Sequence, residues 1–195
     1  MLAKFEGKRP HGCLLQTHAT VASLATSRSP HPVMSFARLL DRFTAAVSGA
    51  DAQGFAALFT AEGRYHDGFF GLHEGRERIA AMLGRFHAGG EDFAWQFLEP
   101  LAVDDLGYAR YLFSYRSLEP ESAGRLIVFE GFARLRLRDG LIADYAEVFD
   151  RGVAFTQLGY AGPRVLKLLQ RYAGELCDSE AAAAHRAWRD DARET

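Results

Sequence analysis

The chain has 195 residues, of which 48% are hydrophobic and 25% are charged, and its formal net charge at pH 7 is -2. This length corresponds to one domain with room for a tail, and this composition excludes wholesale disorder. The near-neutral charge gives no electrostatic case for nucleic-acid binding, which requires a basic surplus. No apolar run approaches the ~18 residues of a membrane-spanning helix, so we expect neither nucleic acid nor membrane as a partner.

The N-terminal region differs from the rest of the chain. Residues 1–33 carry four basic side chains against one acid, contain three prolines and show no sustained periodicity. We predict a disordered extension. A signal peptide is disfavoured because Gln16, Thr17 and His18 interrupt the stretch that would form its apolar centre. Met34 is an alternative start of the native product.

The C-terminal region and the two cysteines suggest no catalytic role. Residues 174–195 predict a polar tail, in which residues 178–180 start a helix that Trp188 could anchor to the domain. Cys13 and Cys177 lie in the terminal regions, so they form no disulfide framework and no zinc-binding pattern. We expect a reduced, cytoplasmic setting and no cofactor.

Helical periodicity dominates the first half of the middle region. Apolar residues recur at helical spacing over residues 36–47, and Gly49 ends that pattern. Asp51 predicts the cap of a second helix, whose apolar side chains are Phe55, Leu58 and Phe59. Residues 63–67 predict a short strand, and a third helix follows with its apolar face over residues 79–86.

After Gly89-Gly90 the period changes from 3.6 to 2, which is typical of strands. We predict strands over residues 93–97, 107–115, 125–138 and 141–149. Asp139-Gly140 predicts a tight turn, so the last two strands pair antiparallel. A final helix is predicted from Pro163, which suits the first turn of a helix.

This order predicts an α+β fold, because helices come early and strands come late. A long antiparallel sheet curved around helices leaves a concave side, and Gly107 and Gly131 are suited to bends in its strands. Alternation places Arg134, Arg136 and Arg138 on the opposite, outer face, where solvent or a dimer interface is favoured over an anion site.

Two segments resemble a known superfamily. The run FTAAVSGADAQGFAALFTAEGRYHDGFFGLHEGRERI and the later DGLIADYAEVFDRGVAFTQLG resemble SnoaL-like and ketosteroid-isomerase-like members of the NTF2-like superfamily. The resemblance covers about residues 36–173, and we assign the domain to residues 34–173. It implies an NTF2-like cone in which helices close a curved sheet over a deep apolar pocket. It also implies a homodimer joined through the outer sheet surface.

The resemblance places Asp67 where ketosteroid isomerases carry the general base. A carboxylate at the mouth of an apolar cavity is partly desolvated, which makes it a better base. The alternative is that Asp67 caps the turn at Gly68 or binds polar ligand groups. The Tyr and Asp that form the isomerase's oxyanion hole align with Phe43 and Ala133, so authentic ketosteroid isomerisation is not expected. Hydroxyl groups that could replace them are those of Tyr111, Tyr115 and Tyr145.

Glu147 is the second candidate, because it resembles the pocket-facing acid of limonene epoxide hydrolases. Those enzymes also need an Arg-x-Asp pair, and this chain has Tyr111-Leu112-Phe113 there, so epoxide hydrolysis by that triad is not expected. The alternative for Glu147 is a salt bridge or a dimer-edge contact. If Asp67 and Glu147 both face the cavity, an acid/base pair with separated pKa values becomes possible.

Histidines provide weaker candidates. His73 is expected in the loop before the third helix, near the rim, as an acid or a gate, or simply as a solvated loop residue. His66 is expected to point away from the cavity by strand alternation. The set of His66, Asp67, His73 and His87 matches no known metal spacing, so no metal is expected.

Aromatic residues are abundant, with fifteen Phe, seven Tyr and two Trp. Most are expected in the core, and a subset is expected to bind an apolar ligand. The predicted ligand-binding residues are Phe43, Tyr65, Trp95, Phe97, Phe113, Tyr115, Phe129 and Tyr145.

The first functional hypothesis is a cofactor-independent enzyme that isomerises, cyclises or otherwise transforms a hydrophobic carbonyl compound by acid/base chemistry. Its catalytic candidates are Asp67, Glu147, Tyr111 and His73. The second hypothesis is a non-catalytic, homodimeric ligand-binding or structural protein, which the absent oxyanion donors favour. A third is the small structural subunit of a larger oxygenase assembly, which uses the same fold.

Overall fold

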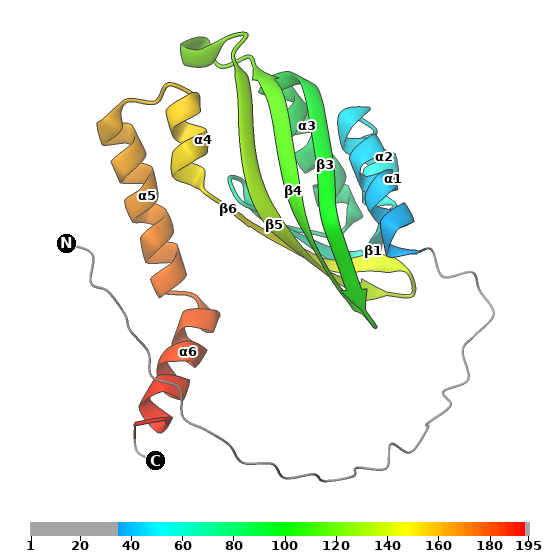
Figure 1. The fold of residues 1–195 in the computed structure, drawn as a ribbon, viewed down its shortest axis with the longest axis vertical. Coiled ribbons are helices and arrows are strands. Elements are labelled where there is room, and N and C mark those ends of the chain that lie inside the picture. The colour runs from blue at the N-terminus through cyan, green and yellow to red at the C-terminus, as the bar shows by residue number, and fades with distance from the viewer. Residues whose placement is uncertain (1–34, 194–195) are drawn as a thin grey trace, which may run out of the picture. The chain divides into compact units, whose positions relative to one another are not determined.

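A computed structural model describes residues 35–193 (Figure 1). The predicted extension, residues 1–33, lies outside the described residues. The described chain forms helices and strands in the order α1 (Phe36–Ser48), α2 (Ala52–Ala56), β1 (Phe59–Asp67), β2 (Gly71–Glu74), α3 (Arg76–Ala88), β3 (Gly90–Val103), β4 (Leu106–Ser117), a 3-10 turn (Pro120–Ser122), β5 (Leu126–Arg138), β6 (Leu141–Phe149), α4 (Arg151–Gln157), α5 (Gly162–Cys177) and α6 (Glu180–Asp191).

The early helices form largely as predicted. Helix α1 begins after Ser35, whose hydroxyl accepts a hydrogen bond from the backbone N–H of Arg38 at 3.4 Å, and α3 ends at Gly89. Helix α2 is capped by Asp51 as predicted. It is shorter than expected, because Phe59 already belongs to β1, where it pairs with β6. Sheet pairing therefore overrides the helical pattern at that position.

The strands form one sheet in the order β2-β1-β6-β5-β4-β3. Strands β3 to β6 pair antiparallel with their neighbours, and Asp139 and Gly140 both have positive φ, 54° and 76°, as the predicted tight turn requires. The sheet is mixed rather than wholly antiparallel, because β1 runs parallel to β6. The intervening strands and α3 make the crossover that a parallel pair needs.

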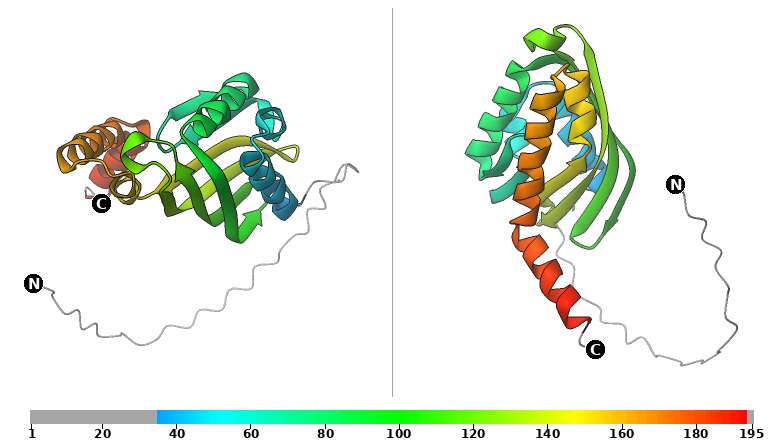
Figure 2. Two further views of the ribbon diagram at one scale, coloured as in Figure 1. Left: turned by 90° about the horizontal axis from the view of Figure 1, so that it is seen from above. Right: turned by 90° about the vertical axis from the view of Figure 1, so that its left-hand side faces the viewer.

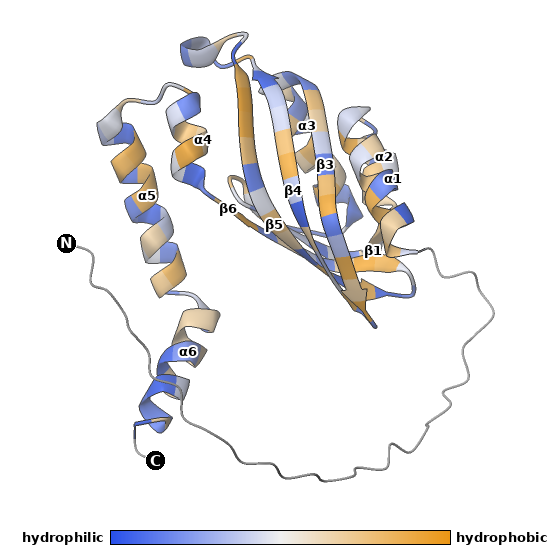
Figure 3. Ribbon diagram, in the orientation of Figure 1, coloured by the Kyte–Doolittle hydropathy of each residue, from blue (hydrophilic) through white to orange (hydrophobic). Residues whose placement is uncertain are grey.

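The curved, unclosed sheet packs against the early helices. Figure 2 shows α1, α2 and α3 on one face of the sheet, and Figure 3 shows hydrophobic and hydrophilic residues alternating along β3, β4 and β5. The fully buried side chains lie between the sheet and the helices, among them Phe43 of α1 and Tyr111, Phe113 and Tyr145 of the sheet. These rings pack against one another, so the inner face of the sheet and the helices share one aromatic core.

The outer face of the sheet is polar and charged, as predicted for the arginine row. Arg138 pairs with Glu62 at 2.9 Å, and Arg134 binds Asp144. Exposed apolar side chains also lie on this face, including Phe132, which is 56% exposed, and Val148, which is 71% exposed.

The C-terminal region is helical. Pro163 lies in the first turn of α5 and Ser179 caps α6, both as predicted. The expectation that Trp188 anchors the tail is wrong, because its side chain is 64% exposed and its ring stacks only on His185 of the same helix. Among the described residues, no helix is both long and apolar enough to cross a membrane.

Gly131 lets the sheet approach an aromatic ring closely. A Cβ at this position would lie 2.5 Å from the Tyr111 ring and 2.7 Å from the carbonyl oxygen of Val148. Gly131→Ala is therefore expected to lower the free energy of unfolding by about 1–3 kcal/mol through overpacking. Urea denaturation measures this change.

The matched control is Gly84→Ala in α3, where an added Cβ would meet nothing within 4 Å outside the helix backbone. We expect this variant to gain about 0.5–1 kcal/mol, the usual difference between Gly and Ala inside a helix. If the Gly131→Ala variant and the unmodified protein have equal free energies of unfolding, the predicted overpacking between the strand and the ring does not occur.

Candidate functional site

Asp67 ends β1 and organises the turn that follows. Its Oδ1 atom accepts hydrogen bonds from the backbone N–H groups of Phe69 and Phe70, both at 2.7 Å. Both bonds go to one oxygen, so Oδ2 stays available to accept a proton. Burial raises the pKa of Asp67, while the two N–H donors, His73 and Arg151 oppose that rise. The turn-capping role and a role as base are therefore compatible.

Glu147 lies beside Asp67 because β6 runs next to β1. Its Oε2 atom accepts a hydrogen bond from the hydroxyl of Tyr145 at 2.9 Å, and its Oε1 atom accepts one from the backbone N–H of Gly68 at 3.3 Å. Burial first, and then the charge of Asp67, raise the pKa of Glu147 to about 8. The pair therefore favours a state in which Glu147 holds a proton while Asp67 is charged.

Two of the three tyrosines proposed as hydroxyl donors lie at Glu147. The ring of Tyr145 stacks on that of Tyr65 with centroids 4.5 Å apart, and its hydroxyl donates to the carboxyl group. Tyr111 is fully buried, and burial together with Glu147 raises its pKa. Its hydroxyl lies close to Glu147 and lowers the pKa of that carboxyl group as a hydrogen-bond donor, although the contact falls outside ordinary hydrogen-bond geometry.

Tyr115 lies apart from both carboxyl groups. Its ring stacks on Phe93 at 5.5 Å, and burial, followed by Tyr160 and Glu119, raises its pKa to about 12. The structure therefore groups Tyr111 and Tyr145 with Glu147 and places Tyr115 elsewhere.

Aromatic side chains fill most of the space inside the sheet. The inner cavity that remains measures about 20 Å³, enough for roughly one water molecule. Its lining residues are Val47, Phe55, Tyr65, Asp67, Phe69, Met82, Leu83, Phe86, Trp95, Phe113, Phe129, Glu147 and Phe149. A larger ligand must displace some of these rings or bind outside them.

A second space, here called the side hollow, measures about 750 Å³. It lies against the β1–β2 turn, β6, α4 and α5, and it shares Asp67, Phe69 and Glu147 with the inner cavity. The two carboxyl groups thus stand at the border between a small aromatic cavity and a hollow of ligand size.

The predicted ligand-binding residues divide into three groups. Tyr65, Trp95, Phe113 and Phe129 line the inner cavity. Phe43, Phe97 and Tyr145 pack behind it, with the Phe43 ring 5.4 Å from that of Tyr145 and 5.3 Å from that of Phe97. Tyr115 faces a different depression, beside Phe93 and Tyr160. Their part in binding stays a prediction.

His73 does not lie in a loop. It belongs to β2, opposite Tyr65 of β1, and its side chain is buried. The sequence pattern misplaced it because β2 has only four residues, too few for a period-2 signal. Burial lowers the pKa of His73 although Asp67 opposes this, which favours the neutral imidazole. Its catalytic role stays a prediction.

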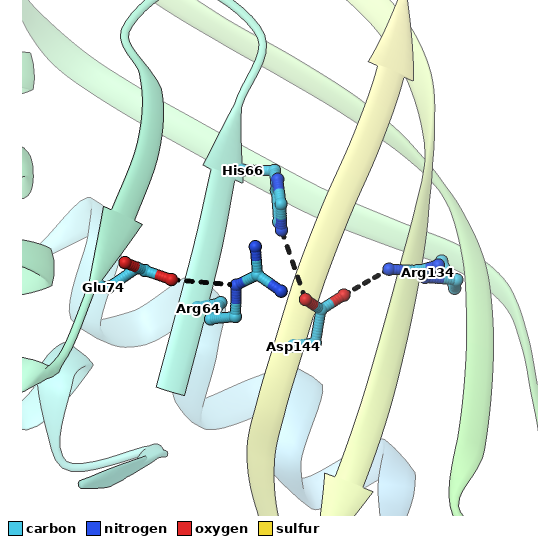
Figure 4. Close-up of polar contacts among 5 residues, drawn as sticks. All are labelled: Arg64, His66, Glu74, Arg134 and Asp144. Atoms are coloured by element: carbon cyan, nitrogen blue, oxygen red, sulfur yellow. Dashed lines mark hydrogen bonds and ion pairs between the residues drawn. The ribbon is translucent and has the colours of Figure 1, made fainter. Parts of the chain in front are cut away.

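His66 points to the outer face, as alternation predicted. Its Nε2 atom lies 3.2 Å from Asp144, which also binds Arg134, while Arg64 pairs with Glu74 at 3.2 Å (Figure 4). Within residues 35–193, no three His, Cys, Asp or Glu side chains gather as a metal site would require.

Two site residues were not predicted from the sequence. The N–H group of Gly68 donates to Glu147, and its carbonyl oxygen accepts a hydrogen bond from Nε of Arg151 at 2.5 Å. Arg151 begins α4, a helix that was not predicted although Asp150 is a recognisable cap: its Oδ1 accepts bonds from the N–H groups of Gly152 and Val153. That cap was the available signal.

Comparison with known proteins identifies the family. The model of the SnoaL-like domain matches residues 40–145, more than half of the chain. The chain belongs to the SnoaL-like family. This confirms the resemblance of the two sequence segments, while the boundaries at residues 34 and 173 stay predictions. No curated protein sequence matches this SnoaL-like chain significantly.

Solved structures similar to this SnoaL-like protein confirm its NTF2-like fold. TsrD of Streptomyces laurentii is 24% identical with a TM-score of 0.56, over 63% of this chain and 93% of that one. IdmH of Streptomyces antibioticus, a putative polyketide cyclase, is 16% identical with a TM-score of 0.55, over 65% and 100%. An LEH-like epoxide hydrolase of M. tuberculosis is 19% identical with a TM-score of 0.52, over 68% and 92%.

Proposed function

We propose that this SnoaL-like protein is an enzyme that moves protons on an apolar carbonyl compound without a cofactor. Asp67 is the base that removes a proton from the carbon next to the carbonyl group, and Glu147 is the acid that supplies a proton to the oxygen. The observation that carries the proposal is the pair of neighbouring carboxyl groups at the border of the inner cavity, one of them with its pKa raised to about 8.

The surroundings of the two carboxyl groups support this division of roles. Backbone N–H groups and the positive charge of Arg151 favour the charged form of Asp67. Burial and the neighbouring charge of Asp67 favour the protonated form of Glu147. At neutral pH the site would hold one base and one acid, the combination that isomerisation, cyclisation and related lyase or hydrolase steps share.

The remaining site residues narrow the chemistry. Phe43 and Ala133 align with the oxyanion donors of ketosteroid isomerases, and both are apolar and buried. Ketosteroid isomerisation is therefore not part of the proposed function. Tyr111 is a buried hydroxyl donor close to Glu147, and its hydrogen bond favours the charged form of that carboxyl group. IdmH is a putative polyketide cyclase and the M. tuberculosis protein is an epoxide hydrolase, which supports cyclisation and hydrolysis as members of the proposed class on this fold.

Exchange of carbon-bound hydrogen tests the proposal without knowledge of the product. The protein is incubated in D2O with a panel of ketosteroid, polyketide-like and terpenoid ketones, and 1H NMR follows the loss of the signal next to each carbonyl group. We expect at least one compound to exchange faster with folded protein than with heat-unfolded protein. Equal rates across the whole panel would contradict the proposal.

Phe43 and Ala133, which carry no oxyanion donor, favour the second hypothesis, a non-catalytic ligand-binding protein. Its ligand would bind in the side hollow of about 750 Å³, because the inner cavity of about 20 Å³ leaves no room between the aromatic rings. A ligand that co-purifies, is identified by mass spectrometry and is returned unchanged would support this function. Assembly into a larger oxygenase would instead appear as a high-mass complex on gel filtration of the native protein.

We also propose that the protein is a homodimer joined through the outer face of the sheet. Phe132 and Val148 are register partners on β5 and β6, and both are exposed there. Together with Leu112 of β4, which is 36% exposed, they form an apolar area flanked by paired charges. Analytical ultracentrifugation measures the mass. The cytoplasmic setting stays a prediction from cysteine content.

A further inference from the structure

Arg151 is held at the edge of the side hollow by three different parts of the chain. Its Nε atom donates to the carbonyl oxygen of Gly68 in the β1–β2 turn at 2.5 Å. Its guanidinium carbon lies 4.2 Å from the ring centre of Tyr172 in α5 and 5.9 Å from that of Phe149 at the end of β6. The cation is therefore fixed in position, and its terminal Nη atoms remain for another partner.

Arg151 is half-buried and forms no salt bridge with a described residue, and its charge acts on Asp67 only from beyond salt-bridge distance. No carboxylate of the described residues lies within 4 Å of its nitrogen atoms, whereas Arg171 in the same hollow pairs with Glu175 at 3.4 Å. A partly buried charge is usually paired, because the loss of hydration is otherwise uncompensated. A guanidinium that has no salt bridge with a described residue and lies on the wall of a ligand-sized hollow is therefore a binding group for an anion.

The rest of the wall defines the other part of the ligand. Phe70, Leu72, Val148 and Leu176 present apolar surface to the side hollow. Asp67 and Glu147 stand on the same wall, and Arg151 is close enough to Asp67 to favour its charged form. A ligand that fits this wall has an apolar body and an oxygen that carries negative charge beside the two carboxyl groups.

We propose that Arg151 binds a negatively charged oxygen of an apolar ligand in the side hollow. The assignment rests on the proposed function, to which it adds that Arg151 supplies the charge stabilisation that Phe43 and Ala133 cannot. When Asp67 takes the proton from carbon, the C–H electron pair forms a C=C bond and the carbonyl π pair moves onto oxygen, where Arg151 balances its charge. Glu147 then protonates that oxygen, which yields the enol.

Two sources of negative oxygen are possible, a carboxylate on the ligand and the enolate itself, and two binding tests distinguish them. Naphthalene-2-carboxylate is compared with naphthalene-2-carboxamide by isothermal titration calorimetry. 2-Naphthol is titrated by absorption, since binding as the naphtholate shifts its spectrum at a pH below its ordinary pKa. We expect at least tenfold preference for the carboxylate over the amide, or a naphtholate spectrum at pH 7.5, or both.

Substitutions then assign the site. Arg151→Gln is expected to abolish the preference for negatively charged oxygen. Arg151→Lys keeps the positive charge but not the planar guanidinium group, so it is expected to retain part of that preference. Arg164→Gln is the control, because Arg164 lies in α5 paired with Glu121 and outside the hollow. Circular dichroism and thermal unfolding confirm that each variant is folded.

The outcomes separate this inference from the proposed function. If neither binding test shows a preference for negatively charged oxygen, the assignment of Arg151 is wrong. It is also wrong if Arg171→Gln removes the preference while Arg151→Gln keeps it. These binding measurements need no turnover. The hydrogen-exchange experiment can fail while anion binding is still lost in Arg151→Gln. In that case the anion-binding site is confirmed, and only the proposed enzymatic function is wrong.

Discussion

Asp67→Asn is expected to lower turnover at least a hundredfold, within the range of about 10² to 10⁴ for loss of a general base. Asparagine keeps a side-chain oxygen that can accept the bonds from Phe69 and Phe70, so the turn after β1 should form. What the variant loses is the ability to take a proton. The measurement is the rate of hydrogen exchange or product formation with a responsive compound from the ketone panel.

Asp144→Asn is the matched control for this prediction. Asp144 lies on β6 like Glu147, but on the outer face, where it contacts His66 and Arg134 (Figure 4). The same chemical change there should leave turnover per folded molecule unaltered. Full activity of the Asp67→Asn variant would remove Asp67 as the base. A similar loss in both variants would indicate general damage to the sheet rather than chemistry.

Stability should fall as the pH rises toward 8, and Glu147 should cause much of this fall. Its pKa is raised from 4.5 to about 8 in the folded protein, so the folded state binds the proton more tightly than the unfolded state. The resulting stabilisation is fully present below about pH 4.5 and is lost as the pH rises through 8. Because one pKa unit corresponds to about 1.4 kcal/mol, the change should reach a few kcal/mol.

Glu147→Gln tests this prediction by urea denaturation between pH 5 and 9. Glutamine cannot titrate, so the slope of unfolding free energy against pH should become shallower. Glu130→Gln is the control, because Glu130 is an exposed partner of Arg110 on the outer face. An unchanged slope in Glu147→Gln would assign the pH dependence to other groups.

The sequence predicted the long elements well because their patterns repeat. Four strands alternate over enough residues to establish a period of 2, and Asp139-Gly140 has the backbone angles of the turn that its sequence predicts. Two short elements were missed for the same reason, although the cap at Asp51 predicted the five-residue α2. Strand β2 has four residues and α4 has seven, so neither shows a period, and His73 and Arg151 were misplaced or missed with them.

The site was predicted only in part. The sequence left open whether Asp67 and Glu147 face one cavity, and the structure places both in the lining of the inner cavity. The amount of space around them could not be predicted, because it depends on how rings from α2, α3, the turn after β1 and five strands fit together. The parallel pairing of β1 with β6 was also missed, since pairing direction depends on the route of the whole chain rather than on local pattern.

That pairing has a consequence for biosynthesis. Strand β1 finds its parallel neighbour only after β6 has been made, some eighty residues later along the polypeptide. A nascent chain that stops before β6 would carry Asp67 without Glu147 or Tyr145, whereas Tyr111 of β4 would already be made. The acid/base pair therefore needs β6 beside β1, and a protein truncated before Glu147 would lack it.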